Sequence, residues 1–265
     1  MGAARPPGAG FRLSVAVPWP LPTSETDLLA LAKGYPFESP GRSYLFREDE
    51  IVPLDRGPGP GLFAERVPVI AHGSNRSPQQ LRRKFGNGAE IPVTRAWLGD
   101  YDVVYSAHVT QYGAIAANLQ HLPGTRVEVY VTWLTAPQLE CMHETELGGE
   151  NYHYGEMAGI ELTLEAGPEA RLSAAYVYLS TRGCLTDEPA RPVGLAAVAA
   201  ERRAHGAVLQ EAAIALVRDR HRPGSDLDQH ILTTIRDRAL RRDLIAEMAE
   251  HALPASAPHF RILEG

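Results

Sequence analysis

This sequence has few cysteines, no long apolar run and no excess of positive charge. Each of these absences excludes a class of protein. Two cysteines, Cys141 and Cys184, are too few for a disulfide framework, although a single disulfide between them remains an alternative. No apolar run approaches the ~20 residues that a membrane-spanning helix needs. The formal net charge of −6 argues against a general nucleic-acid-binding protein, which is normally basic. We therefore expect a reduced, cytoplasmic protein that binds neither membrane nor nucleic acid.

Motifs that would hold a metal or a cofactor are also missing. The histidines and glutamates do not stand in the His-Glu-x-x-His spacing or a similar zinc-ligand pattern. The glycines of the 56–61 segment alternate with prolines, so they do not form a phosphate loop, and no dinucleotide fingerprint is present. Ser74 lacks the Gly-x-Ser-x-Gly elbow of a nucleophilic serine. The sequence thus predicts no metal and no cofactor.

The composition that remains, 44% hydrophobic and 22% charged, is typical of a folded globular protein. Proline, glycine and the apolar pattern divide the chain into four segments. We predict a disordered start over 1–10, an irregular N-terminal extension over 11–65 with one short helix at 24–33, a core domain over 66–184 and a helical extension over 185–265.

The core domain reads as a succession of short strands. Runs rich in β-branched and aromatic residues predict strands over 67–71, 91–98, 101–109, 114–119, 126–134, 157–165 and 171–180. Two helices interrupt them, starting after Ser77 and Thr135, where Ser-Pro-Gln-Gln and Thr-Ala-Pro-Gln have the form of capping boxes. This order favours an α+β fold with a mainly antiparallel, barrel-like sheet and flanking helices.

Alanine and leucine dominate the last segment. Their pattern predicts two long helices, over 193–220 and 227–252, separated by Arg222-Pro-Gly-Ser. Such helices would pack on the core or on a second copy of the chain, which would make a homodimer through the C-terminal helices.

The most informative stretch follows the first core strand, at His72-Gly73-Ser74-Asn75. A strand, a glycine turn and a helix start place backbone N–H groups where they can bind an anion or a polarised carbonyl. Gly73 has no Cβ, so a ligand can approach the main chain closely. The residues alone leave open whether the segment is a binding site or simply a turn.

This stretch, with the following Ser-Pro-x-x-Leu, resembles the Tyr-Gly-Ser-Asn-Leu loop of the γ-glutamylcyclotransferase family, and the order of later elements agrees over about residues 66–184. The resemblance implies that family's barrel-like fold. It also implies an enzyme of γ-glutamyl and glutathione metabolism that cyclises a γ-glutamyl amino acid or amine to 5-oxoproline and releases the amine, without a cofactor. His72 replaces the family's tyrosine and Arg76 an apolar residue, which puts the choice of substrate in question.

A glutamate lies on the apolar face of the helix predicted after Thr135. Leu139, Met142 and Glu146 fall at i, i+3 and i+7, so they share a face. Burial disfavours the ionised carboxylate, and so does the negative end of the helix dipole. Both effects predict a raised pKa, suited to proton exchange near neutrality.

The family resemblance extends to this helix, because Met142-His-Glu-Thr-Glu-Leu-Gly148 is similar to the Leu-Asp-x-x-Glu-Gly stretch that holds the family's catalytic glutamate. The resemblance implies that Glu146 is the general acid/base. His143 and Leu147 depart from the pattern. It further implies that the substrate is bound by residues of the turn and by two tyrosines: His72, Gly73, Ser74, Asn75, Tyr152 and Tyr176.

Two points stay open in the sequence. Strand alternation puts Tyr178 on the same face as Tyr176, so the pattern does not separate them. The departures at His72 and Leu147, with the uncovered tail, also allow a catalytically retired or repurposed small-molecule-binding protein, or a biosynthetic enzyme that removes a γ-glutamyl group from a larger amine.

Overall fold

The computed structural model describes residues 20–47, 50–54, 59–86, 88–148, 151–188 and 191–264. The disordered start predicted over 1–10 lies outside these residues, as does the first half of the glycine–proline segment at 56–61. Both cysteines are free thiols.

Five strands of the described chain close on themselves to form a barrel. β3 pairs with β5, β5 with β4, β4 with β6, β6 with β7, and β7 returns to β3. Only the β3–β7 contact in this ring is parallel. The mainly antiparallel, barrel-like α+β fold is therefore confirmed. The strands are β1 (Tyr44–Arg47), β2 (Glu50–Pro53), β3 (Val67–Ala71), β4 (Glu90–Val109), β5 (Ile115–Leu134), β6 (Tyr152–Leu164), β7 (Arg171–Ser180), β8 (Thr186–Glu188), β9 (Arg191–Pro192), β10 (Gly194–Leu195), β11 (Ala200–Glu201), β12 (Ala207–Val208) and β13 (Phe260–Glu264).

The predicted strand pairs 91–98/101–109 and 114–119/126–134 are each one continuous strand. At the first junction Asp100 takes a positive φ of 60°, and the pairing with β5 shifts register between Gly99 and Tyr101. The Gly-Asp signal that the sequence presents as a turn is thus an irregularity inside β4, of the kind that bends barrel strands.

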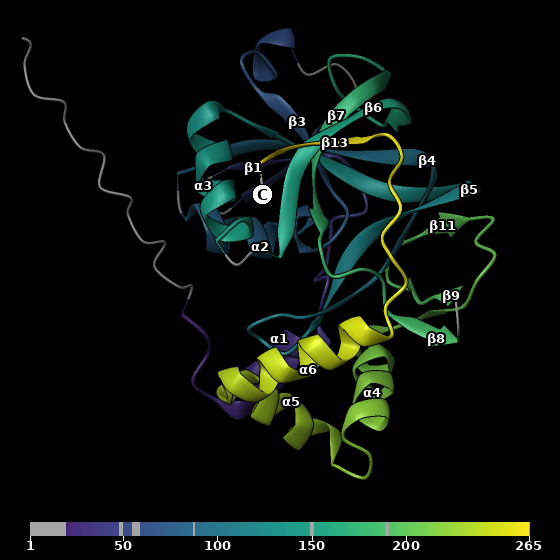
Figure 1. Cartoon of the computed structure of the whole chain (residues 1–265). Helices are drawn as coiled ribbons and strands as arrows, with labels where there is room; N and C mark the ends of the chain where they lie inside the picture. Colours follow the sequence, from purple (N-terminus) through teal and green to yellow (C-terminus); the bar gives the residue numbers. More distant parts are fainter. Residues whose placement is uncertain are drawn as a thin grey trace, which may run out of the picture.

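Helices cover the barrel in two groups (Figure 1). α2 and α3 lie side by side next to the barrel, whereas α1, α4, α5 and α6 gather at one end of it. The helices are α1 (Glu25–Lys33), α2 (Pro78–Phe85), α3 (Ala136–Glu146), α4 (Gln210–His221), α5 (Leu227–Arg236) and α6 (Arg238–Glu250), with short 3₁₀ turns η1 (Pro60–Leu62) and η2 (Ser74–Arg76). No helix in the described ranges has the length and apolar character to cross a membrane.

Helices of the N-terminal and C-terminal extensions pack against each other. α1 contacts α5, Lys33 forms ion pairs with Asp228 and Glu211 at 2.7 and 3.3 Å, and Arg236 pairs with Glu25 at 2.6 Å. The largest hydrophobic cluster contains residues from α1, from the barrel and from all three C-terminal helices.

Two sequence predictions about the extensions are wrong. The helix expected over 193–220 begins only at Gln210, because residues 194–195 and 207–208 form β10 and β12, which pair with each other, while Gly194 pairs with β4. The helix expected over 227–252 is broken at Asp237, which ends α5 and caps α6 through its side chain. The irregular 11–65 segment contains the predicted helix α1, but also β1 and β2, which extend the sheet beside β4.

Candidate active site

The turn after β3 is held in place by the barrel strand that precedes it and by the helix that follows it. Val69, Ile70 and Ala71 are buried, so β3 is fixed between β5 and β7, and the chain leaves the sheet at His72. It then forms η2 and enters α2, whose N-terminus is capped by the hydroxyl of Ser77, which accepts a hydrogen bond from the N–H of Gln79. The predicted strand, turn and helix start are therefore confirmed.

Gly73 is required here by close packing. A Cβ at this position would lie 2.5 Å from the hydroxyl of Tyr35 and 3.4 Å from the Cβ of Ala117. The Tyr35 hydroxyl is itself fixed, because it accepts a hydrogen bond of 2.8 Å from the N–H of Ala117. Any larger residue at position 73 would therefore displace the Tyr35 hydroxyl from Ala117.

Three N–H groups begin this turn. Within the described chain, the N–H groups of Gly73, Ser74 and Asn75 donate to no main-chain carbonyl, whereas that of Ser77 donates to Ser74 at 2.9 Å. Unpaired donors of this kind at the start of a helical turn are able to bind an anion or an oxyanion.

α3 brings the predicted carboxylate to the turn. The helix starts with the capping box of Thr135 and Gln138, and it ends at Glu146. Met142 is buried on the same face, whereas Glu140 and Glu144 are exposed, as the helical spacing predicts.

Glu146 contacts two elements, each of which lies more than sixty residues before it in the sequence. Its Oε1 accepts a hydrogen bond of 3.0 Å from Nδ2 of Asn75, and it forms a close ion pair with the ammonium group of Lys84 in α2. The side chains of Glu146 and Lys84 are only 15% and 7% exposed. The sequence-predicted glutamate and turn therefore meet, with a primary ammonium group bound between α2 and α3.

The predicted rise in the pKa of Glu146 is wrong. Burial does act to raise the pKa, but the charge and hydrogen bond of Lys84 and the hydrogen bond of Asn75 act against it, and the pKa lies below 4.5. Lys84 lies in the last turn of α2, and in the sequence it is only one of three consecutive basic residues there. Glu146 is consequently ionised at neutral pH.

Buried aromatic and histidine side chains surround this carboxylate. The charge of Glu146 adds to burial in raising the pKa of Tyr112 and of Tyr152, so both hydroxyls stay protonated. Ser74 shares a side-chain hydrogen bond with Tyr112. Burial lowers the pKa of His72 to about 4, although Glu146 opposes this, so the imidazole is neutral at pH 7. Tyr112 is a site residue that sequence reasoning missed, because it lies in the loop between β4 and β5, away from any motif.

The structure separates the two tyrosines that alternation left equivalent. Tyr178 shares a hydrogen bond of 2.8 Å with Nδ1 of His143, and its pKa is raised by burial and by the charge of Glu146. Tyr176 stacks on Tyr154 at 5.5 Å and lies opposite Val69 of β3. Of the pair, Tyr178 is the one near Glu146.

A pocket of about 520 Å³ is lined by residues that include Arg76 and Tyr35, and Glu146 is not among them. Within the described ranges, no group of three or more His, Cys, Asp or Glu side chains is placed to hold a metal ion.

Comparison with known proteins gives a likeness only among solved structures. No family model matches the sequence, and no curated protein matches it. A γ-glutamyl cyclotransferase aligns over 69% of this chain and 99% of its own, at 14% identity and a TM-score of 0.37. The likeness is one of fold alone. An uncharacterised protein from Homo sapiens aligns over 72% of this chain and 90% of its own (13% identity, TM-score 0.38), and a protein from Arabidopsis thaliana over 44% and 70% (17%, 0.34). A shared fold does not by itself indicate a shared reaction.

Proposed function

We propose that this protein is a γ-glutamyl cyclotransferase, which cyclises a γ-glutamyl amino acid or amine to 5-oxoproline and releases the amine. One observation carries the proposal. The carboxylate of Glu146 is tied to Asn75 of the turn and already binds a primary ammonium group, that of Lys84. A γ-glutamyl substrate offers the same chemical group, its α-ammonium, as its internal nucleophile.

The reaction needs a proton acceptor first. The α-ammonium of the substrate takes the place of the lysine ammonium beside Glu146, and the ionised carboxylate removes one of its protons. The free amine then attacks the γ-carbonyl carbon of the same molecule and closes a five-membered ring. Because nucleophile and electrophile belong to one substrate, the enzyme has only to hold it in the reactive shape.

The same groups complete the reaction. Ring closure places negative charge on the former carbonyl oxygen, and the N–H groups of Gly73, Ser74 and Asn75 are the donors that stabilise it. The C–N bond to the leaving amine breaks as protonated Glu146 returns its proton to that nitrogen. The carboxylate regenerated in this way then takes the remaining extra proton from the ring nitrogen, which becomes the lactam N–H, and passes it to the departing amine, which leaves as an ammonium ion.

Buried side chains set the surroundings of the reaction. Neutral His72 and the protonated hydroxyls of Tyr112 and Tyr152 add no competing charge beside Glu146. They exclude water and orient the substrate, and Tyr178 with His143 extends this wall. Burial strengthens every electrostatic interaction made there.

A binding protein on the same fold is the second candidate, and the Lys84–Glu146 ion pair favours it. A lysine that holds the carboxylate permanently would leave a site that recognises γ-glutamyl compounds without turning them over.

One experiment separates the two functions. The protein is incubated with γ-glutamyl amino acids and γ-glutamyl amines, and 5-oxoproline and the freed amine are measured by chromatography. Their release in equal amounts supports the enzyme. If no compound is turned over while one of them raises the melting temperature, the binding protein is the better account.

A further inference from the structure

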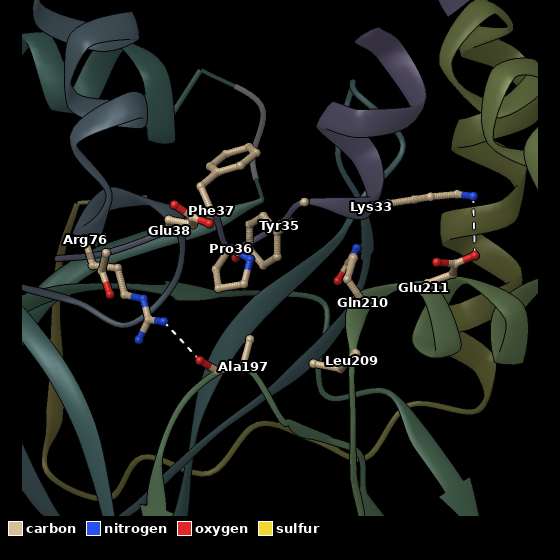
Figure 2. Close-up of a pocket in the computed structure, with 12 residues that line it drawn as sticks. Lys33, Tyr35, Pro36, Phe37, Glu38, Arg76, Ala197, Leu209, Gln210 and Glu211 are labelled. Carbon is tan, nitrogen blue, oxygen red and sulfur yellow. Dashed lines mark hydrogen bonds and ion pairs between the residues drawn. The ribbon is translucent and has the colours of Figure 1, made fainter. Parts of the chain in front are cut away.

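The 520 Å³ pocket beside the turn joins Arg76 of the core to segments of the N-terminal and C-terminal extensions. Its walls come from the segment after α1, from the turn at Arg76 and from the start of α4. Figure 2 shows Arg76 on one side of the pocket and Gln210 on the other, with Tyr35 and Pro36 between them. A pocket of this size accommodates a small metabolite.

Arg76 is buried without a full set of partners. Its side chain donates from Nη2 to the carbonyl of Ala197 at 3.1 Å, while Nε and Nη1 have no hydrogen-bond acceptor within the described residues. Glu128 lies 3.5 Å from Nη1, but it is bound more closely by Arg95, at 2.7 Å. Arg76 is only 4% exposed, and it shares the negative charge of Glu128 with Arg95. The binding of a further anion by its guanidinium group would therefore be favourable.

Gln210 is buried in the same pocket with an unused amide. Its side chain is the first of α4, is 3% exposed, and neither Nε2 nor Oε1 has a hydrogen-bond partner in the part of the chain that the structure describes. A buried amide left unpaired on both atoms is costly, and a ligand that pairs with both removes the cost. That ligand must offer a donor and an acceptor together.

The charged and apolar side chains at the rim of the pocket also bear on which ligand it can bind. The two carboxylates that line the pocket, those of Glu38 and Glu211, are exposed at its rim, and Glu211 is paired with Lys33. Leu209, 62% exposed, gives the rim an apolar surface that a hydrocarbon part of a ligand would cover.

We propose that this pocket binds a small carboxylate that also carries an amide. The carboxylate accepts hydrogen bonds from the guanidinium of Arg76, and the amide of the ligand pairs with the carboxamide of Gln210. A lactam suits Gln210 best, because its N–H and C=O point to the same side and meet Nε2 and Oε1 together. Glu146 does not line this pocket, so the proposal does not depend on Glu146 being catalytic.

Calorimetric titration with 5-oxo-L-proline tests the proposal on the full chain. Gln210→Leu removes both hydrogen-bonding atoms, and Ala197→Trp fills the pocket from its exposed rim. Each is expected to weaken binding about tenfold or more, because two hydrogen bonds are lost or the space is filled. Gln229→Leu, on the exposed face of α5, is the matched control and is expected to bind as the unchanged protein does.

Glu146→Gln distinguishes this pocket from the proposed active site, where 5-oxoproline would be the product. Binding that survives Glu146→Gln and is lost in the two pocket variants supports the inference. Binding that is lost with Glu146→Gln and kept in both pocket variants overturns it. So does the absence of binding at about 10 mM, well above the Kd of a specific metabolite site.

Discussion

At the scale of single residues, the site depends on Lys84. It is the largest opposing influence on the pKa of Glu146, which burial alone would raise. Glu146 and Asn75 could be found from sequence because each belongs to a short pattern on a helix or turn. Lys84 could not, because Arg82, Arg83 and Lys84 read as a solvated helix end, and only the packing of α2 on α3 selects one of them.

We predict that Lys84→Met raises the pKa of Glu146. Burial then acts without the lysine charge, so the acid limb of the pH–rate profile of 5-oxoproline formation moves to higher pH. Arg82→Met, an exposed change on the same helix, should leave the limb in place. A Lys84→Met profile that coincides with that of the unchanged protein would show that Glu146 is not the titrating group.

Gly73 gives a prediction about stability. Gly73→Ala places a methyl group 2.5 Å from the Tyr35 hydroxyl, which must move away from Ala117. Overpacking of this kind costs about 1–3 kcal/mol, measured by urea unfolding. Gly61→Ala, where an added Cβ meets nothing within 4 Å, should change stability by less than about 0.5 kcal/mol. Equal stabilities for the two variants would refute the packing argument.

At the scale of elements, the sequence pattern predicts the strands of the barrel correctly but predicts a helix where the 193–208 segment forms short strands. Alternation and turn residues located the strands from β3 to β7, because each strand buries its own apolar residues. The 193–208 segment has helix-forming alanines, yet it pairs as β10 and β12. A Cβ on Gly194 would lie 3.0 Å from Ala207, and such a long-range contact has no local signal.

A buried ion pair fixes that segment to the barrel. Arg203 donates to both carboxylate oxygens of Asp102 at 2.6 and 2.8 Å, and Asp102 is fully buried in β4. Arg203→Met leaves this carboxylate without its main partner, so we predict a loss of about 3–5 kcal/mol in unfolding free energy. The exposed pair of Arg126 and Glu201 is the control, and Arg126→Met should cost less than about 1 kcal/mol. Similar losses in both variants would contradict the role given to Asp102.

At the scale of the whole molecule, buried histidines contribute to the response of stability to acid. Burial lowers the pKa of His72 and of His108 to about 4, from 6.5 in the unfolded chain. The unfolded state therefore binds more protons between these values, and folding is fully stabilised only above pH 6.5. The titration of each histidine lowers the free energy of unfolding by up to about 3 kcal/mol as the pH falls from 6.5 to 4, and it causes no further loss below pH 4.

Urea unfolding at several pH values between 7.5 and 4 checks this prediction. His108→Gln should reduce the slope of unfolding free energy against pH, because one of the two groups no longer titrates. His251→Gln, at an exposed position, should keep the slope of the unchanged protein. An unaltered slope in His108→Gln would mean that His108 is protonated in the folded state as readily as in the unfolded chain.

The most direct test of the proposed reaction is the rate of 5-oxoproline formation by Glu146→Gln. If Glu146 transfers both protons, the rate with the best γ-glutamyl substrate falls by about 10²–10⁴-fold. Glu144→Gln, an exposed change on the same helix, should keep the full rate. Circular dichroism of both variants checks that they are folded. A folded Glu146→Gln protein that retains near-full turnover would contradict the account.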